Sequence, residues 1–170
     1  MNWTRCFNRP AFIALLALLL SGCFDEVAAP LQVGVKAPPF VLELIAGGQA
    51  TMKAPHGNGH VITFMSSWCP CSNESIPLIK DAHQRYGERD ITFLLVGIQD
   101  PESKFEAFVE KWQLPFPAGY DADNKIARAY GVSAPPTTIF VDRQGLVKRV
   151  FYGNIKDKEG EFLEWTNELL

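Results

Sequence analysis

The sequence has few of the groups on which metal, nucleotide and nucleic-acid chemistry depend. Its 170 residues include three histidines and four cysteines, and the formal net charge is −3. A negative net charge without any run of basic residues gives no electrostatic basis for binding nucleic acid. The sequence has no glycine-rich phosphate-binding loop, and so it indicates no organic cofactor. Internal repeats and low-complexity tracts are also lacking, and the length fits one domain with a full core.

The one long apolar run lies at the N-terminus and is too short to predict a membrane span. Arg5 and Arg9 precede the apolar residues 11–20, and the sequence Leu-Ser-Gly-Cys, ending at Cys23, follows them. This order is typical of a secretory signal peptide. Leu-Ser-Gly-Cys resembles the lipobox of bacterial lipoproteins, and the resemblance implies that Cys23 carries lipid and begins the mature protein. A plain signal peptide, in which Cys23 has no special role, is the alternative.

These features predict three segments. We expect a lipoprotein signal peptide at 1–22, a lipidated tether at 23–38 and a folded domain at 39–170. The protein would then be lipid-anchored in the cell envelope, on the periplasmic side or the outer surface. Phe24 follows Cys23 directly and Asp25 comes one step later, so the sequence leaves the choice between inner and outer membrane open.

Two cysteines remain once Cys6 leaves with the signal peptide and Cys23 is lipidated. They are Cys69 and Cys71, and they lie on either side of Pro70. A disulfide between them would close almost no loop and would stabilise the fold very little. In an exported protein such a pair indicates redox-active thiols rather than a structural disulfide.

The apolar patterns predict an α/β sandwich with helices on both faces of the sheet. A hairpin precedes the sandwich and a second hairpin precedes its last helix. The expected strands are 40–45, 49–53, 60–65, 91–98, 137–141 and 147–152, and the expected helices are 72–86, 103–112, 123–130 and 159–169.

The thiols are expected where a buried strand turns into a helix. The unpaired N–H groups and the dipole at a helix N-terminus favour a thiolate over a thiol. A thiolate in that place is a nucleophile for disulfides and peroxides. Redox chemistry at Cys69 is therefore the first hypothesis.

Four stretches together resemble the thioredoxin fold, and more narrowly the exported bacterial TlpA/ResA/DsbE-type and redoxin proteins. They are residues 34–40, 64–69, 130–138 and 141–145. The resemblance implies a thioredoxin-like sandwich with a central mixed sheet and thiol–disulfide oxidoreductase activity on exported protein thiols or disulfides. It also implies a membrane thiol–disulfide reductase as electron donor. Cytochrome c maturation and the reduction of copper-site thiols are the tasks it suggests.

The resemblance also assigns roles to single residues. Pro136 matches the proline that is cis in thioredoxin-like folds and faces the active cysteine, so the backbone of Pro135 would pair with an extended substrate. Trp68 would shield the thiolate and shape access to it. Asp100 is the nearest match to the acid that TlpA/ResA-type proteins place after the next strand, and it would relay protons. Thr63 stands where many thioredoxins carry a buried Asp.

The thiol motif departs from the family pattern Cys-x-x-Cys. Cys71 is two residues after Cys69, about 200° round a regular helix, and Ser72 occupies the position one turn on. If the family motif is aligned on Trp68 and Pro77, Ser72 stands in the place of the second cysteine. If it is aligned on Glu74, Cys71 stands in that place. We prefer the first register. Three mechanisms stay open: a Cys69–Cys71 disulfide, Cys69 working alone, and a peroxidatic Cys69.

Two alternatives to disulfide exchange follow from the same thiols. A thiol peroxidase would resemble Pro-x-x-x-Thr-x-x-Cys, but Ile62 and Ser66 occupy the Pro and Thr positions here. A copper-binding chaperone could use Cys69, Cys71 and Met65, which suit Cu(I). Chaperones of this fold pair their thiols with a histidine far downstream. The three histidines, His56, His60 and His83, give no such partner, so we expect no metal site.

Overall fold

The computed structural model describes residues 29–53 and 57–170. The strands are β1 (Phe40–Glu43), β2 (Gln49–Met52), β3 (Gly59–Met65), β4 (Ile91–Gly97), β5 (Ala118–Tyr120), β6 (Thr137–Val141) and β7 (Val147–Tyr152). The helices are α2 (Pro70–Tyr86), α3 (Glu102–Trp112), α4 (Lys125–Ala129) and α5 (Glu159–Asn167), with a 3₁₀ turn η2 (Ile155–Lys158) before α5. The expected signal peptide, Cys23 and His56 lie outside the described residues.

A five-stranded mixed sheet forms the centre of the molecule, in the order β5-β4-β3-β6-β7. β3 runs parallel to β4 and antiparallel to β6, and β1 and β2 form a separate antiparallel hairpin. All seven residues of β3 are buried, as expected of a central strand covered on both faces. The sequence-based prediction of a thioredoxin-like sandwich with an N-terminal hairpin is confirmed.

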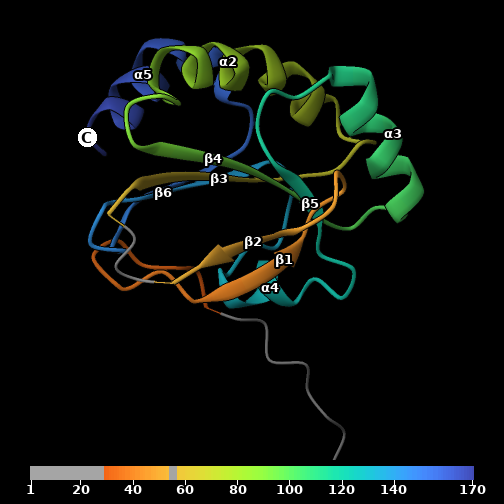
Figure 1. Ribbon diagram of the computed structural model, residues 1–170, viewed down its shortest axis with the longest axis horizontal. Coiled ribbons are helices and arrows are strands. Elements are labelled where there is room, and N and C mark those ends of the chain that lie inside the picture. Colours follow the sequence, from red (N-terminus) through yellow and green to blue (C-terminus); the bar gives the residue numbers. More distant parts are fainter. Residues whose placement is uncertain (1–28, 54–56) are drawn as a thin grey trace, which may run out of the picture.

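Helices cover both faces of the sheet (Figure 1). On one face, Val61 and Met65 of β3 join a core cluster that includes Ile76 of α2, Phe105 of α3 and Phe162 of α5. On the other face, alternate strand residues pack against the hairpin and against α4. In Figure 1, α2 and α5 lie above the sheet, and the hairpin and α4 lie below it.

The observed elements differ from the expected ones mainly at boundaries. α2 begins at Pro70 rather than at residue 72, which puts Cys71 inside the helix. Proline suits the first helical position, because an N–H at that position would have no partner within the helix, so its absence costs nothing. The φ of proline is also already helical. β5 was not predicted, since a strand of three residues carries no readable alternation.

The segment before β1 and the loop after it cover both edges of the sheet. Gly34 N donates to Val147 O at 2.7 Å and Val147 N donates to Val35 O at 2.8 Å, at the start of β7. At the opposite edge, Ile45 N donates to Ala118 O of β5 at 2.9 Å. Residues 34–37 thus pair with the domain, although they fall inside the stretch expected to be a tether.

Across residues 29–53 and 57–170, no helix has the length and apolar character needed to cross a membrane.

Candidate active site

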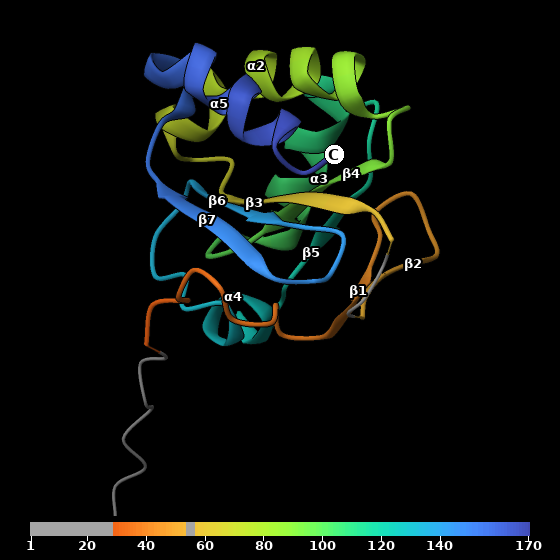
Figure 2. The ribbon, with the colours of Figure 1, turned by 90° about the vertical axis from the view of Figure 1, so that its left-hand side faces the viewer.

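Three loops meet at one end of the sheet because of the strand register. Met65 at the end of β3 lies opposite Gly97 at the end of β4, and Phe64 lies opposite Thr137 at the start of β6. The loops 66–69, 98–100 and 133–136 therefore converge there. In Figure 2 this is the left-hand end, where β3 leads into α2.

Cys69 occupies the N-cap position of α2. Its backbone is extended, with φ −82° and ψ 119°, and no side chain caps the helix. The Cys69 Sγ lies 3.7 Å from the Pro135 carbonyl oxygen, a thiol-to-carbonyl contact. The residue is 7% exposed. The structure thus places Cys69, the first of the two predicted thiols, at the start of α2 and in contact with the loop before β6.

Cys71 is the second residue of α2 and is half-buried, so it is the more accessible of the two cysteines. Both are free thiols. Burial raises the pKa of the Cys71 thiol, and the neighbouring charges of Cys69 and Glu74 raise it further. Cys71 therefore holds its proton more firmly than an ordinary cysteine does.

The turn that carries Trp68 and Cys69 is fixed from both sides. The Asn73 side-chain amide donates to Ser67 O and to Cys69 O, each at 3.0 Å. From the other side, Ser67 N donates to the Asp100 carboxylate. The turn is held by side chains from α2 and from the loop after β4.

Asp100 is buried, at 7% exposed, and does not behave as a solvated turn residue. Its carboxylate accepts the Ser67 N–H and its carbonyl accepts the Tyr120 hydroxyl. These contacts place Asp100 beneath the turn that carries Cys69. Asp100 contacts Ser67, which is two residues before Cys69 in the chain. A proton-relay role for it stays a prediction.

Trp68 is 59% exposed, and its indole N–H donates to the Gln99 carbonyl at 2.8 Å. The ring therefore stands on the surface beside Cys69 in a fixed orientation. Its predicted function as a shield of the thiolate is not tested by this contact.

The Pro135–Pro136 peptide bond is cis, as the sequence resemblance implied. Pro136 is buried and Pro135 is half-buried. Pro136 O accepts from Gly153 N at 2.8 Å, and Ala134 O accepts from the Thr137 hydroxyl at 2.8 Å. The end of the loop next to β6 is thus anchored, and the Pro135 carbonyl faces Cys69.

Ser72 and Thr63 take the two positions where the motif departs from the thioredoxin pattern. Ser72 is buried, and its hydroxyl accepts the Ser66 N–H at 3.4 Å. Thr63 is buried with its hydroxyl 3.3 Å from that of Thr138. Neither position offers a second thiol or a titratable acid to Cys69.

The residues weighed for copper binding do not gather around the thiols. Met65 is fully buried in the core, and His83 packs edge-on against Phe93 with ring centroids 5.4 Å apart. His60 is buried at the start of β3, the end of the strand away from Cys69. In the described part of the chain, no cluster of three or more His, Cys, Asp or Glu side chains could hold a metal ion.

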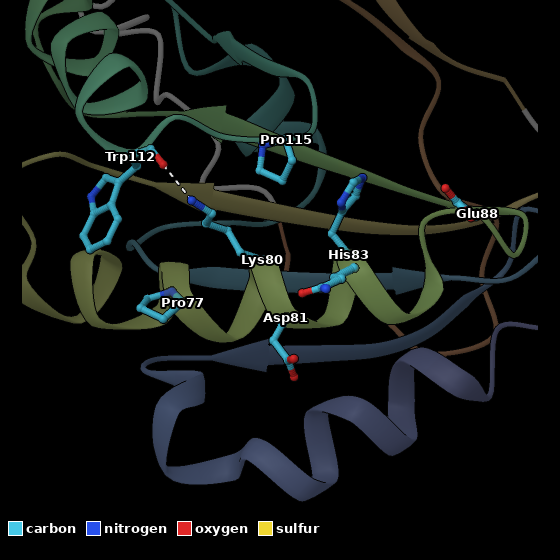
Figure 3. A pocket seen from close by; sticks show the side chains of 8 residues that line it. Pro77, Lys80, Asp81, His83, Glu88, Trp112 and Pro115 are labelled. Carbon is cyan, nitrogen blue, oxygen red and sulfur yellow. Dashed lines mark hydrogen bonds between the residues drawn. The ribbon is translucent and has the colours of Figure 1, made fainter.

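A separate groove of about 650 Å³ runs along α2, away from the thiols (Figure 3). Its lining includes Pro77, Lys80, His83, Trp112 and Pro115 and none of the predicted site residues. Lys80 Nζ donates to Trp112 O at 3.0 Å, and burial lowers the pKa of His83. This groove is therefore separate from the thiol site, which lies at the end of the sheet.

Sequence reasoning missed Asn73 and Gln99. Asn73 lies four residues after Cys69, a spacing that could have pointed to a contact once the helix was known to begin at Pro70. Gln99 carries no such signal, because its contacts with residues 68, 124 and 133 depend on the tertiary fold.

Comparison with known proteins gives one family and one fold. The AhpC/TSA family model matches residues 33–150. The thiol-disulfide oxidoreductase ResA of Geobacillus kaustophilus is 31% identical over 139 residues, covering 81% of this chain and 79% of that protein. ResA of Geobacillus thermodenitrificans is 29% identical over 148 residues, covering 86% and 84% respectively. A thiol:disulfide interchange protein of the thioredoxin family from Chlorobium tepidum superposes with a TM-score of 0.71 at 18% identity, covering 83% of this chain and 99% of that one.

Proposed function

The chain belongs to the AhpC/TSA family and is a thiol–disulfide oxidoreductase with a thioredoxin-like fold, and from this premise we propose that Cys69 and Cys71 exchange disulfides with exported proteins. The observation that carries the proposal is the position of Cys69. It lies at the first turn of α2, with its sulfur 3.7 Å from Pro135 O beside a cis proline. A nucleophilic thiol needs such a site, where helix N–H groups favour negative charge.

The exchange proceeds in two steps. The Cys69 thiolate attacks one sulfur of a substrate disulfide; that S–S bond breaks, and the other substrate sulfur leaves as a thiolate and takes a proton. Cys71 then loses its proton and attacks the Cys69 sulfur, which releases the second substrate thiol. Two electrons pass from the pair to the substrate, and a Cys69–Cys71 disulfide remains. A thiol reductant must then return two electrons to the pair.

Three neighbours support this chemistry. Trp68, exposed and next to Cys69 in the chain, would shield one side of Cys69 and bound the surface that a substrate meets. The cis Pro135–Pro136 loop, with the Pro135 carbonyl toward Cys69, offers backbone to an extended substrate segment. Asp100, buried beneath Ser67, is the candidate to move the proton of the departing thiol.

The proposed setting is the cell envelope. The lipobox resemblance at Cys23 supports export and lipid anchoring, with a membrane thiol–disulfide reductase as electron donor. Cytochrome c haem-site cysteines or copper-site cysteines are the proposed targets, which makes the protein a reductant.

Thiol trapping and mass spectrometry across a graded glutathione redox buffer test the proposal. Cys6→Ser and Cys23→Ser are combined in every sample, so that Cys69 and Cys71 are the only thiols. We expect a reversible loss of two hydrogens that disappears in both Cys69→Ser and Cys71→Ser. We also expect Cys71→Ser, but not Cys69→Ser, to form a stable mixed disulfide with a substrate peptide.

Other outcomes would contradict parts of this proposal. A trapped mixed disulfide in Cys69→Ser would reverse the roles of the two thiols. A glutathione adduct at Cys69 without any loss of two hydrogens would show a thiol that works alone. Stoichiometric Cu(I) binding by the pair, without disulfide formation, would support a chaperone instead.

A thiol peroxidase is the second candidate, because a nearly buried thiol without a Cys-x-x-Cys partner also suits attack on a peroxide. One contact counts against it. The Ser66 hydroxyl, in the position of the peroxiredoxin threonine, donates to Ile98 O at 2.5 Å, so its proton is already engaged by the backbone. Saturable peroxide consumption by the wild type would favour this candidate.

A further inference from the structure

Gln99 contacts each of the loops around Cys69. Its backbone N–H donates to the Asn124 side chain at 3.1 Å, and its carbonyl accepts the Trp68 indole N–H at 2.8 Å. Its side-chain amide donates to Ser133 O at 2.9 Å. One residue thus joins the Trp68 turn to the loop that carries the cis proline.

The backbone of Gln99 is fixed in an uncommon conformation. Its φ is +52°, in the left-handed region that residues other than glycine rarely adopt. Hydrogen bonds on both its N–H and its carbonyl hold this conformation. The direction of the Gln99 side chain toward Ser133 is therefore built into the loop.

Ser133 lies two residues before Pro135, whose carbonyl faces the Cys69 sulfur. The far end of the same loop is held by the Thr137 hydroxyl on Ala134 O and by Gly153 N on Pro136 O. At the near end, the Gln99 amide holds Ser133 O, next to the Val132 N–H, which donates to Ala127 O at 2.8 Å. The Gln99 contact ties the start of this loop to the turn that carries Trp68.

We propose that Gln99 is a positioning residue that sets the spacing of Trp68 and Pro135 across Cys69, and so determines how well the site accepts polypeptide disulfides rather than small ones. The inference rests on the proposed exchange at Cys69. An extended peptide must meet both Trp68 and the Pro135 backbone while its sulfur reaches Cys69, so its rate depends on their spacing. A small disulfide needs only the sulfur of Cys69.

Two substrates with the same leaving group separate these cases. One is bis(2-hydroxyethyl) disulfide, and the other is an extended peptide whose single cysteine is in mixed disulfide with 2-mercaptoethanol. The pre-reduced chain carrying Cys6→Ser and Cys23→Ser is mixed with each, and the release of thiol gives a second-order rate constant. In Gln99→Ala we expect the peptide rate constant to fall about three- to tenfold, the effect of one lost hydrogen bond. The rate constant for the small disulfide should stay within about twofold.

Two variants serve as controls. Gln144→Ala removes an exposed glutamine at the opposite end of the β6–β7 hairpin and should change neither rate constant. Gln99→Asn keeps an amide and tolerates a positive φ, but it is one methylene too short to reach Ser133. It should behave as Gln99→Ala does.

Three results would overturn the inference. An equal fall for both substrates would make Gln99 a general support of the turn, and no fall for either would remove its role. Wild-type rates in Gln99→Asn, with a loss in Gln99→Ala, would assign the effect to backbone conformation. Failure of the wild type to react with either disulfide would instead contradict the proposed function itself.

Discussion

The environment of Cys71 favours its protonated thiol. Burial raises its pKa first, and the charges of Cys69 and Glu74 add to the effect. Glu74 is itself held by the Asn154 side-chain amide at 2.8 Å and by Lys156 Nζ at 3.8 Å. The carboxylate therefore stays near the first turn of α2 and helps to keep Cys71 protonated over a wider pH range. In the proposed exchange this would slow the second step.

Glu74→Gln should make Cys71 more reactive. Because the negative charge of Glu74 raises the pKa of Cys71, its removal lowers that pKa and increases the thiolate fraction at pH 8. We expect alkylation of Cys71 to become about two- to fivefold faster at that pH. Iodoacetamide kinetics on a chain with Cys6, Cys23 and Cys69 changed to serine measure this directly.

Glu88→Gln is the matched control, since Glu88 is exposed just beyond the other end of α2. In Glu88→Gln, the rate of Cys71 alkylation should equal that of the parent chain. A rate unaffected by Glu74→Gln would mean that burial alone sets the reactivity of Cys71.

The start of α2 sets the positions of both candidate partners of Cys69. With the helix beginning at Pro70, Ser72 lies one turn after Cys69. Cys71 lies between them, and its thiol interacts with that of Cys69 through charge and side-chain hydrogen bonding. Ser72 is buried, and in the register that we prefer it stands in the place of the second cysteine of a Cys-x-x-Cys motif. In that register the helix would keep the geometry of a Cys-x-x-Cys site with serine at the second position.

Moving the second thiol to residue 72 should restore that site. In the Cys71→Ser/Ser72→Cys variant we expect an intramolecular disulfide between residues 69 and 72. It should form at a lower potential than the Cys69–Cys71 pair, because residues three apart on a helix face each other. Thiol trapping across glutathione buffers gives both potentials. Cys71→Ser alone should yield only a glutathione adduct, and the same adduct in the double variant would refute the expected geometry.

Patterned elements were predictable from the sequence, and contacts between distant loops were not. The continuous apolar run of β4 and the turn at residues 142–145 gave strand and hairpin directly. β5 was not predicted, because its three residues become a strand only by pairing with β4. Cys69 and the cis Pro136 were found because local motifs mark them. Gln99 and Asn73 were not, since the chain brings them to the site only when the strand ends converge.

At the scale of the whole molecule, the proposed lipid anchor and the proposed thiol chemistry occupy separate parts of the chain. The proposed lipid site at Cys23 precedes the described residues, and the thiols lie at the end of the sheet. A covalent acyl chain contributes about 0.8 kcal/mol of membrane affinity for each buried methylene group. Attachment should therefore depend on Cys23 and leave the chemistry at Cys69 and Cys71 unaltered.

Cys23→Ser should move the protein from the membrane to the soluble fraction. Cell fractionation in the native host gives the distribution, and thiol trapping of the purified variant should give the wild-type redox potential. Cys6→Ser is the control, because it alters a cysteine of the expected signal peptide and should leave the protein at the membrane. A wild type found in the soluble fraction would contradict lipidation.

The cover on both sheet edges has a consequence for how the chain reaches its folded state. Residues 34–37 and 44–45 leave the ribosome early, but their partners at residues 118–119 and 145–147 are made much later. Until they dock, both edges present unpaired backbone groups to which another chain can add. We therefore expect the nascent protein to be prone to intermolecular aggregation until these two segments dock, so that a holding chaperone would help at that stage.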